Sequence, residues 1–365
     1  MTSRRAFLGG LAAATALPAP SWADAGHPSH ITAARDADGA YALYGLRETG
    51  DLAFRVALPS RGHAAAAHPT APEAVAFARR PGTFALVLDC TDGAVCHRLD
   101  AAEGRHFYGH GAFSEDGTRL FTTENEIETG EGLVGIWDRT ENYRRVGEFR
   151  IGGIGPHEML RIPGRSTLAV AIGGIRTHPE RGRDKLNLDT MRPGLALFTE
   201  EGALLDRVEV PAEIHRNSLR HIAAREDGLV ACACQWQGDA FDAPPLLALY
   251  RESKLDFVEI PGPAHRRMKG YAGSVALHDG GRRVAITSPR GGVVVSVDVD
   301  GGYRSAAARP DISGVAAGRG GALTTDGMGA VHRLSGQDET GLEKLAQHRL
   351  AFDNHLIRLD VGGGA

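Results

Sequence analysis

Five histidines occupy equivalent positions in five repeats of the chain, and imidazole nitrogens bind metals and carry protons. The repeats align at Gly62-His63, Gly109-His110, Pro156-His157, Arg220-His221 and Asn354-His355. In three repeats a glycine follows seven residues after the histidine, at Gly117, Gly164 and Gly228. The same offset identifies two copies without histidine, Ser274 to Gly281 and Gly314 to Gly321. Scattered histidines, in a chain that has 16 of them, would not be this regular, so we expect a shared site.

The repeats also contain short runs of β-prone residues separated by turn residues. After His110 these runs cover residues 119–123, 133–137 and 145–149, and similar runs follow His157 and His221. Four strands per unit, repeated about every 45 residues, are typical of the blades of a β-propeller. The repeats therefore predict an all-β protein with seven blades, two of them without a histidine.

The two ends of the chain are expected to share one blade. The run that begins at His355 looks like an inner strand with no later strands to accompany it. Residues 31–33, 41–44 and 54–58 look like three strands without an inner one. The C-terminal strand would then complete the first blade and close the ring, which removes exposed sheet edges.

Equivalent histidines at the start of the inner strands would meet around the propeller axis. Several imidazoles in one small space cannot all be protonated cheaply at neutral pH, and a bound metal ion resolves that conflict. Imidazole suits iron, copper, zinc and nickel. We therefore expect a transition metal, iron or copper, with five ligands: His63, His110, His157, His221 and His355. The alternative is that these histidines are structural and bind only backbone groups and water.

Other polar residues are candidates for the surroundings of this site. Expected outer residues, which would orient the rings through their second nitrogen, are Glu124, Asn125, Glu158, Arg220 and Asn354. Glu124 or Glu158 could also complete an iron site. Four glutamates between residues 124 and 131 are expected on the same face, where they would attract a cation or would simply be solvated.

The N-terminus indicates export. Ser3-Arg4-Arg5-Ala6-Phe7-Leu8, followed by apolar residues to Leu17, is typical of a twin-arginine signal. Cleavage after Ala23 would separate a signal peptide, residues 1–23, from one propeller domain, residues 24–365. The mature protein would then be periplasmic, without a membrane span.

Composition and motifs exclude several functions. A net charge of -4 argues against nucleic-acid binding. The sequence contains no G-x-S-x-G, P-loop or H-E-x-x-H motif. Cys90 and Cys96 flank a predicted turn and could be bridged or free, whereas Cys232 and Cys234 share a strand face.

Four segments resemble an uncharacterised family of twin-arginine-exported β-propellers, domain of unknown function 1513. They are residues 109–117, 122–125, 153–158 and 353–356. The resemblance implies a periplasmic seven-bladed propeller. It also implies partnership with periplasmic iron-uptake proteins, such as imelysin-like and di-haem proteins, and it implies no established reaction.

Three functions are compatible with these observations. The first is a periplasmic metal-binding propeller, accessory to the acquisition or handling of iron or copper. The second is a redox enzyme that uses the same metal. The third is a structural or adaptor propeller that binds a partner protein through its loops. Whether the protein is an enzyme is left open by the sequence.

Overall fold

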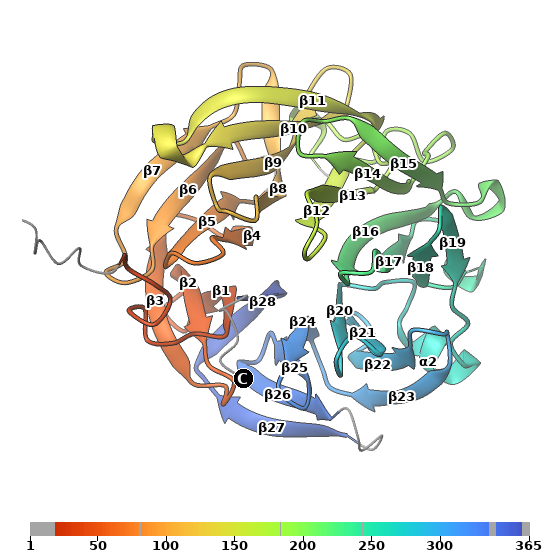
Figure 1. Cartoon of the computed structure of the whole chain (residues 1–365). Coiled ribbons are helices and arrows are strands. Elements are labelled where there is room, and N and C mark those ends of the chain that lie inside the picture. Colours follow the sequence, from red (N-terminus) through yellow and green to blue (C-terminus); the bar gives the residue numbers. More distant parts are fainter. Residues whose placement is uncertain (1–18, 80–81, 183, 243, 336–340, 360–365) are drawn as a thin grey trace, which may run out of the picture.

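Seven antiparallel four-stranded sheets surround a central channel (Figure 1). This computed structural model describes residues 19–79, 82–182, 184–242, 244–335 and 341–359. The predicted all-β, seven-bladed architecture is confirmed. In every blade the strand nearest the channel is the one that begins a predicted repeat.

The strands of each blade are given from the axis outward. The first blade consists of β28 (Leu350–Arg358), β1 (His30–Asp36), β2 (Tyr41–Leu46) and β3 (Leu52–Leu58). The second consists of β4 (Gly62–Ala67), β5 (Glu73–Ala78), β6 (Phe84–Asp89) and β7 (Val95–Asp100). The third consists of β8 (Arg105–Phe113), β9 (Arg119–Glu126), β10 (Glu131–Asp138) and β11 (Arg144–Ile154). The fourth consists of β12 (Pro156–Arg161), β13 (Thr167–Ile172), β14 (Gly194–Thr199) and β15 (Leu204–Glu209).

The remaining three blades follow the same plan. The fifth consists of β16 (Asn217–Ala224), β17 (Val230–Trp236), β18 (Leu247–Arg251) and β19 (Lys254–Phe257). The sixth consists of β20 (Ser274–His278), β21 (Arg283–Ser288), β22 (Val293–Asp298) and β23 (Tyr303–Ala308). The seventh consists of β24 (Ile312–Gly318), β25 (Gly321–Asp326), β26 (Ala330–Ser335) and β27 (Leu342–Gln347). The short helices lie in connections: η1 (Arg139–Glu141), η2 (Pro179–Arg181), η3 (Ala212–Ile214), η4 (Ala240–Asp242) and α2 (Gly262–Arg267).

The last strand closes the ring, as predicted. β28 pairs antiparallel with β1, and Ile31 lies opposite Ile357. Both ends of the described chain therefore belong to the first blade (Figure 1). This closure supplies the first blade with its inner strand and places His355 on the axis.

The hydrophobic core is divided among the interfaces between neighbouring blades. Strand β17 shows how: Ala231 and Ala233 pack toward the sixth blade, whereas Cys232 and Cys234 pack toward the fourth. Alternate residues of a strand point to opposite faces, so a strand buried on both faces is apolar throughout. The two cysteines share a face, as predicted, and all four cysteines are free in the structure.

The glycines that recur seven residues after the start of a repeat lie at turns. Their φ angles are positive, and they are Gly117, Gly164, Gly228, Gly281 and Gly321. L-residues rarely adopt such angles, so glycine is the residue suited to turning the chain from the first to the second strand of a blade.

The N-terminal part of the described chain is packed against the first two blades. Trp22 is 1% exposed, and its indole N–H donates to the carbonyl of His68 at 2.9 Å. It lies in the same core cluster as Ile31 and Leu88. The predicted export signal lies mostly outside the described residues, and the predicted cleavage after Ala23 stays a prediction, although Trp22 belongs to the packed core. Among the described residues, the helices are too short and polar to cross a membrane.

Candidate metal centre

The five predicted histidines lie at irregularities in the innermost strands. Each inner-strand ladder shifts its register at or beside the histidine: between Gly62 and Ala65, Phe107 and Gly111, Pro156 and Glu158, Leu219 and His221, and across Asp353 to His355. A β-bulge bends the strand and redirects a side chain. By contrast, β20, which has no histidine, pairs with β21 in an uninterrupted register. In β24 the register shifts between Ile312 and Val315, where the residues are Ser313 and Gly314.

Gly109 makes room for the first imidazole of the cluster. Its φ is +103°, and a Cβ atom there would lie 2.3 Å from Cδ2 of His63. Both the backbone angle and the close approach require glycine. The residue directly before His110 therefore allows the imidazole of the neighbouring blade to reach the axis.

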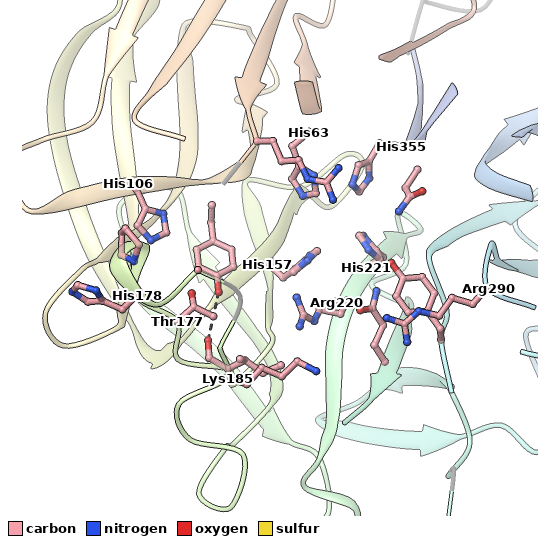
Figure 2. A pocket seen from close by; sticks show the side chains of 18 residues that line it. His63, His106, His157, Thr177, His178, Lys185, Arg220, His221, Arg290 and His355 are labelled. Carbon is pink, nitrogen blue, oxygen red and sulfur yellow. Dashed lines mark hydrogen bonds between the residues drawn. The ribbon is translucent and has the colours of Figure 1, made fainter. Parts of the chain in front are cut away.

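The five imidazoles form one compact cluster, and Figure 2 shows four of them, His63, His157, His221 and His355. The ring of His110 is central, with its centroid 4.9 Å from that of His63 and 4.7 Å from that of His355. The same centroid is 5.5 Å from His157 and 6.1 Å from His221. His157 and His221 are 4.8 Å apart. The rings are not splayed apart, and the structure brings together all five residues singled out from the sequence.

The nitrogen positions form groups of three that could hold a metal ion. Two overlapping groups, His63–His110–His355 and His110–His157–His221, each offer ligand atoms that lie within 4.8 Å of one another. Nitrogens bound at about 2.1 Å on opposite sides of one ion would lie about 4.2 Å apart. Small side-chain rotations would bring the nitrogens from the observed separations of up to 4.8 Å to this distance. In addition, Nε2 of His110 and Nδ1 of His157 are buried without a hydrogen-bond partner.

Burial favours the neutral form of three of these imidazoles, those of His110, His157 and His355. Burial lowers the pKa of His110 well below its usual value, and the neighbouring imidazoles of His355 and His63 lower it further. The pKa of His157 is also well below its usual value because of burial and then the charge of Arg220. Burial and the imidazole of His221 lower the pKa of His355 to about 4. A neutral imidazole has a lone pair for a metal ion, so these three rings are in the ligating form at neutral pH.

Glu158 is part of the cluster, closer than an outer residue is expected to be. Its Oε2 lies 3.1 Å from Nδ1 of His221 and accepts the backbone N–H of Ile222 at 2.9 Å. Its Oε1 lies 3.6 Å from Nδ1 of His110. Glu158, His221 and His355 form a third group whose ligand atoms are within 4.8 Å. A carboxylate that accepts from Nδ1–H fixes the tautomer in which Nε2 is free to bind a metal.

The other residues expected around the site have different positions. Arg220 and Asn354 line a cavity above the rings, and the Nε of Arg220 donates to Oγ of Ser218 at 2.8 Å. Glu124 is fully buried and accepts from Arg145 of β11 at 2.6 Å. The side-chain amide of Asn125 donates to the carbonyl of Glu126 at 3.1 Å. Glu124 and Asn125 are thus engaged within the third blade.

The four glutamates between residues 124 and 131 are not among the residues that line the cavity over the cluster. Glu124 is buried against Arg145, and Glu126 and Glu131 both pair with Arg150. Charge neutralisation by arginines of β11 removes most of the field that these carboxylates would have supplied. Arginines thus pair with three of the four carboxylates, whereas Glu128 is exposed, and attraction of a cation by this loop stays a prediction.

A cavity of about 320 Å³ opens directly over the imidazoles (Figure 2). His63, His157, His221 and His355 form its floor, and the long 174–193 connection supplies one wall with His178 and Lys185. Arg79, Tyr271 and Arg290 come from other blades. Arg79, Lys185 and Arg290 are scattered through the chain and follow no repeat, so the sequence did not single them out.

Fold and site together define a seven-bladed β-propeller with a cluster of imidazoles on its axis. The sequence matches the family described as "Protein of unknown function (DUF1513)" over residues 56–359, and the chain belongs to that family. None of the curated proteins matches the sequence.

Solved structures that are similar share the propeller fold at low identity. Hydrazine synthase of Kuenenia stuttgartiensis has a TM-score of 0.55 at 14% identity, covering 78% of this chain and 80% of that one. The protein U3-55K has a TM-score of 0.59 at 12% identity, covering 82% and 86%. The computationally designed Ika8 protein has a TM-score of 0.55 at 12% identity, covering 89% and 88%. These similarities establish the fold alone.

Proposed function

We propose that this protein is a metal-binding β-propeller that holds one transition-metal ion on its axis. The ligands are imidazole nitrogens of His63, His110, His157, His221 and His355. Iron or copper is the proposed ion, because imidazole suits both and a neutral five-histidine set is unlike the oxygen-rich sites of calcium.

One observation carries this proposal: five imidazoles from five blades converge, and two of their buried nitrogens have no hydrogen-bond partner. Buried polar atoms are normally satisfied, so an unpaired nitrogen aimed into a cluster of imidazoles needs an explanation. A structural role would be served by hydrogen bonds to the backbone, as His30 makes to the carbonyl of Ala317 at 2.7 Å. The axial histidines instead face one another.

Glu158 positions two of these ligands in the proposed site. Its carboxylate lies beside Nδ1 of His221 and Nδ1 of His110, which leaves Nε2 of each ring for the ion. It also supplies a negative charge that partly balances a bound cation. The carboxylate is therefore a positioning group for His110 and His221.

The cellular role that we propose is the acquisition or handling of iron or copper outside the cytoplasm. The twin-arginine pattern at Arg4-Arg5 supports export to the periplasm. The family resemblance supports partnership with imelysin-like or di-haem proteins. Metal binding by the propeller would then serve uptake or storage.

The direct test is the metal content of the protein isolated from the periplasm, and of the same protein after reconstitution with Fe(II) without oxygen or with Cu(II). We expect one ion per chain, and loss of that ion in the His110→Ala, His221→Ala double variant. His97→Ala, on the outermost strand of the second blade, is the matched control and should keep the metal. Substoichiometric metal after both reconstitutions would overturn the proposal.

A metal-dependent redox enzyme is the second candidate, and the cavity favours it. Space for a small molecule lies directly against four of the five imidazoles. An enzyme of this kind would keep one coordination position accessible from that cavity. Addition of azide to the metal-loaded protein should then change its visible spectrum, whereas an unchanged spectrum would favour storage or transfer of the ion.

A further inference from the structure

The two openings of the channel differ in chemistry. The cavity over the imidazoles is lined by the cationic side chains Arg79, Lys185, Arg220 and Arg290. Among its described lining residues there is no aspartate or glutamate. The opposite opening, which contains Glu158, is lined mainly by alanine and larger apolar residues of the inner strands. The opposite opening also carries Arg161 and Arg358 beside Glu158, but only the cavity over the imidazoles combines four cationic side chains with no carboxylate among its described lining residues, so an anion is favoured there.

The cationic groups influence one another and the imidazoles that line the same cavity. Burial lowers the pKa of Lys185, and the charges of Arg220 and Arg290 lower it further. Arg220 also lowers the pKa of His157, and Arg79 contributes to the lowered pKa of His355. These four side chains come from three blades and the 174–193 connection, so the shared field arises only in the folded protein (Figure 2).

Neutral partners position two of these cations without cancelling their charge. The guanidinium of Arg290 lies over the ring of Tyr271, 4.4 Å from its centroid. The ammonium of Lys185 donates to Oε1 of Gln237 at 2.6 Å. Cations held by an aromatic face and an amide keep donors and charge for a ligand.

A metal ion would add to this excess positive charge. Five neutral imidazoles and one carboxylate, that of Glu158, would leave a divalent ion with a net charge of about +1 and a trivalent ion with about +2. Neutralisation by a carboxylate-bearing ligand is then favourable, because such a ligand pairs with arginine through two parallel hydrogen bonds. The cavity of about 320 Å³ is at the small end of ligand pockets, which suits a compact organic acid.

We propose that this cavity binds a small organic polycarboxylate, which rests on Arg79, Lys185, Arg220 and Arg290 and directs an oxygen toward the axial imidazoles. The inference deepens the proposed function and rests on it, since the anion would share the site with the bound metal. The protein would accordingly take its metal together with an anionic organic ligand rather than as a bare cation.

The test is isothermal titration of the full chain with propane-1,2,3-tricarboxylate, before and after metal loading. We expect binding to the metal-free protein, tightened by about tenfold when metal is present. The neutral triamide of the same skeleton should not bind. Lys185→Gln and Arg290→Gln should each weaken binding by about tenfold or more. Arg144→Gln is the control, because Arg144 is exposed and pairs with Glu141.

The outcomes separate this inference from the proposed function. Tricarboxylate binding that depends on Lys185 and Arg290, in a protein that takes up no metal, would support the anion site. The same result would overturn the proposed metal-binding function. Metal uptake without tricarboxylate binding would overturn the anion site alone. Binding that is unchanged in Lys185→Gln and Arg290→Gln would also overturn it, provided that thermal unfolding shows both variants folded.

Discussion

At the scale of single residues, the candidate site depends on keeping imidazoles neutral and correctly oriented. Burial disfavours the imidazolium form of His110, His157 and His355. Glu158 selects which nitrogen of His221 carries the proton. Both effects prepare lone pairs for a cation before any cation arrives, which reduces the reorganisation that binding requires.

Replacing Glu158 tests whether it orients the ligands. Glu158→Gln keeps the size of the side chain but removes the charge, and we expect it to weaken metal binding by about 10- to 100-fold. Competition with a chromophoric chelator would measure this change. Glu126→Gln, at the end of β9, is the control and should bind normally. Equal affinities of wild-type protein and Glu158→Gln would contradict the assigned role.

Replacing Gly109 tests the space that it leaves for His63. In Gly109→Ala the added Cβ collides with the imidazole, so His63 must move and metal affinity should fall. Gly104→Ala is a matched control, because Gly104 also has a positive φ, +73°, but has nothing within 4 Å of the added Cβ. Both variants should lose about 1–3 kcal/mol of stability through backbone strain. Equal metal affinities in the two variants would refute the steric argument.

At the scale of elements, the inner strands combine two tasks. Their regular parts pair within a blade and pack between blades, and their bulges turn histidines toward the axis. The segment before the first blade adds to the hydrophobic core, because Trp22 packs between β1 and β5.

Replacing Trp22 tests whether the folded unit begins before residue 24. Trp22→Ala removes a buried ring and its hydrogen bond to His68, so we expect a loss of about 3–5 kcal/mol in the free energy of unfolding. Denaturant unfolding would measure it. Phe241→Ala is the control, because Phe241 is 97% exposed. A wild-type midpoint for Trp22→Ala would show that the segment before Asp24 is dispensable.

The sequence predicted the blades, the closing strand and the five imidazoles because all three follow from repetition. It predicted less well whatever depends on contacts between repeats. Glu158 reaches His221 across a blade interface, and this contact has no signature along the chain. Glu124 was expected near the site, but it lies in β9, where Arg145 of the adjoining hairpin neutralises it. Lys185 and Arg290 meet only through tertiary structure.

At the scale of the whole molecule, neutral histidines buried away from the axis make stability sensitive to acid. Burial lowers the pKa of His278 to about 4 and also lowers those of His30 and His332. In the unfolded chain these imidazoles take up protons near pH 6.5. Between pH 6.5 and 4 the unfolded state therefore binds more protons, and folding stability falls as the pH is lowered.

This dependence can be measured by denaturant unfolding of the metal-free protein between pH 7 and pH 4. We expect stability to be greatest above pH 6.5 and to fall on acidification, by on the order of 3 kcal/mol from His278 alone. His278→Gln should reduce the slope, whereas His97→Ala should not. Identical slopes in all three proteins would contradict the assignment of a neutral, buried His278.

The most direct test of the account is anomalous diffraction from crystals of the metal-loaded protein, recorded at the absorption edge of the ion. The account predicts one strong anomalous peak on the propeller axis, about 2.1 Å from nitrogens of the clustered histidines, including His110 and His221. A peak elsewhere, or none on the axis after metal loading, would contradict it.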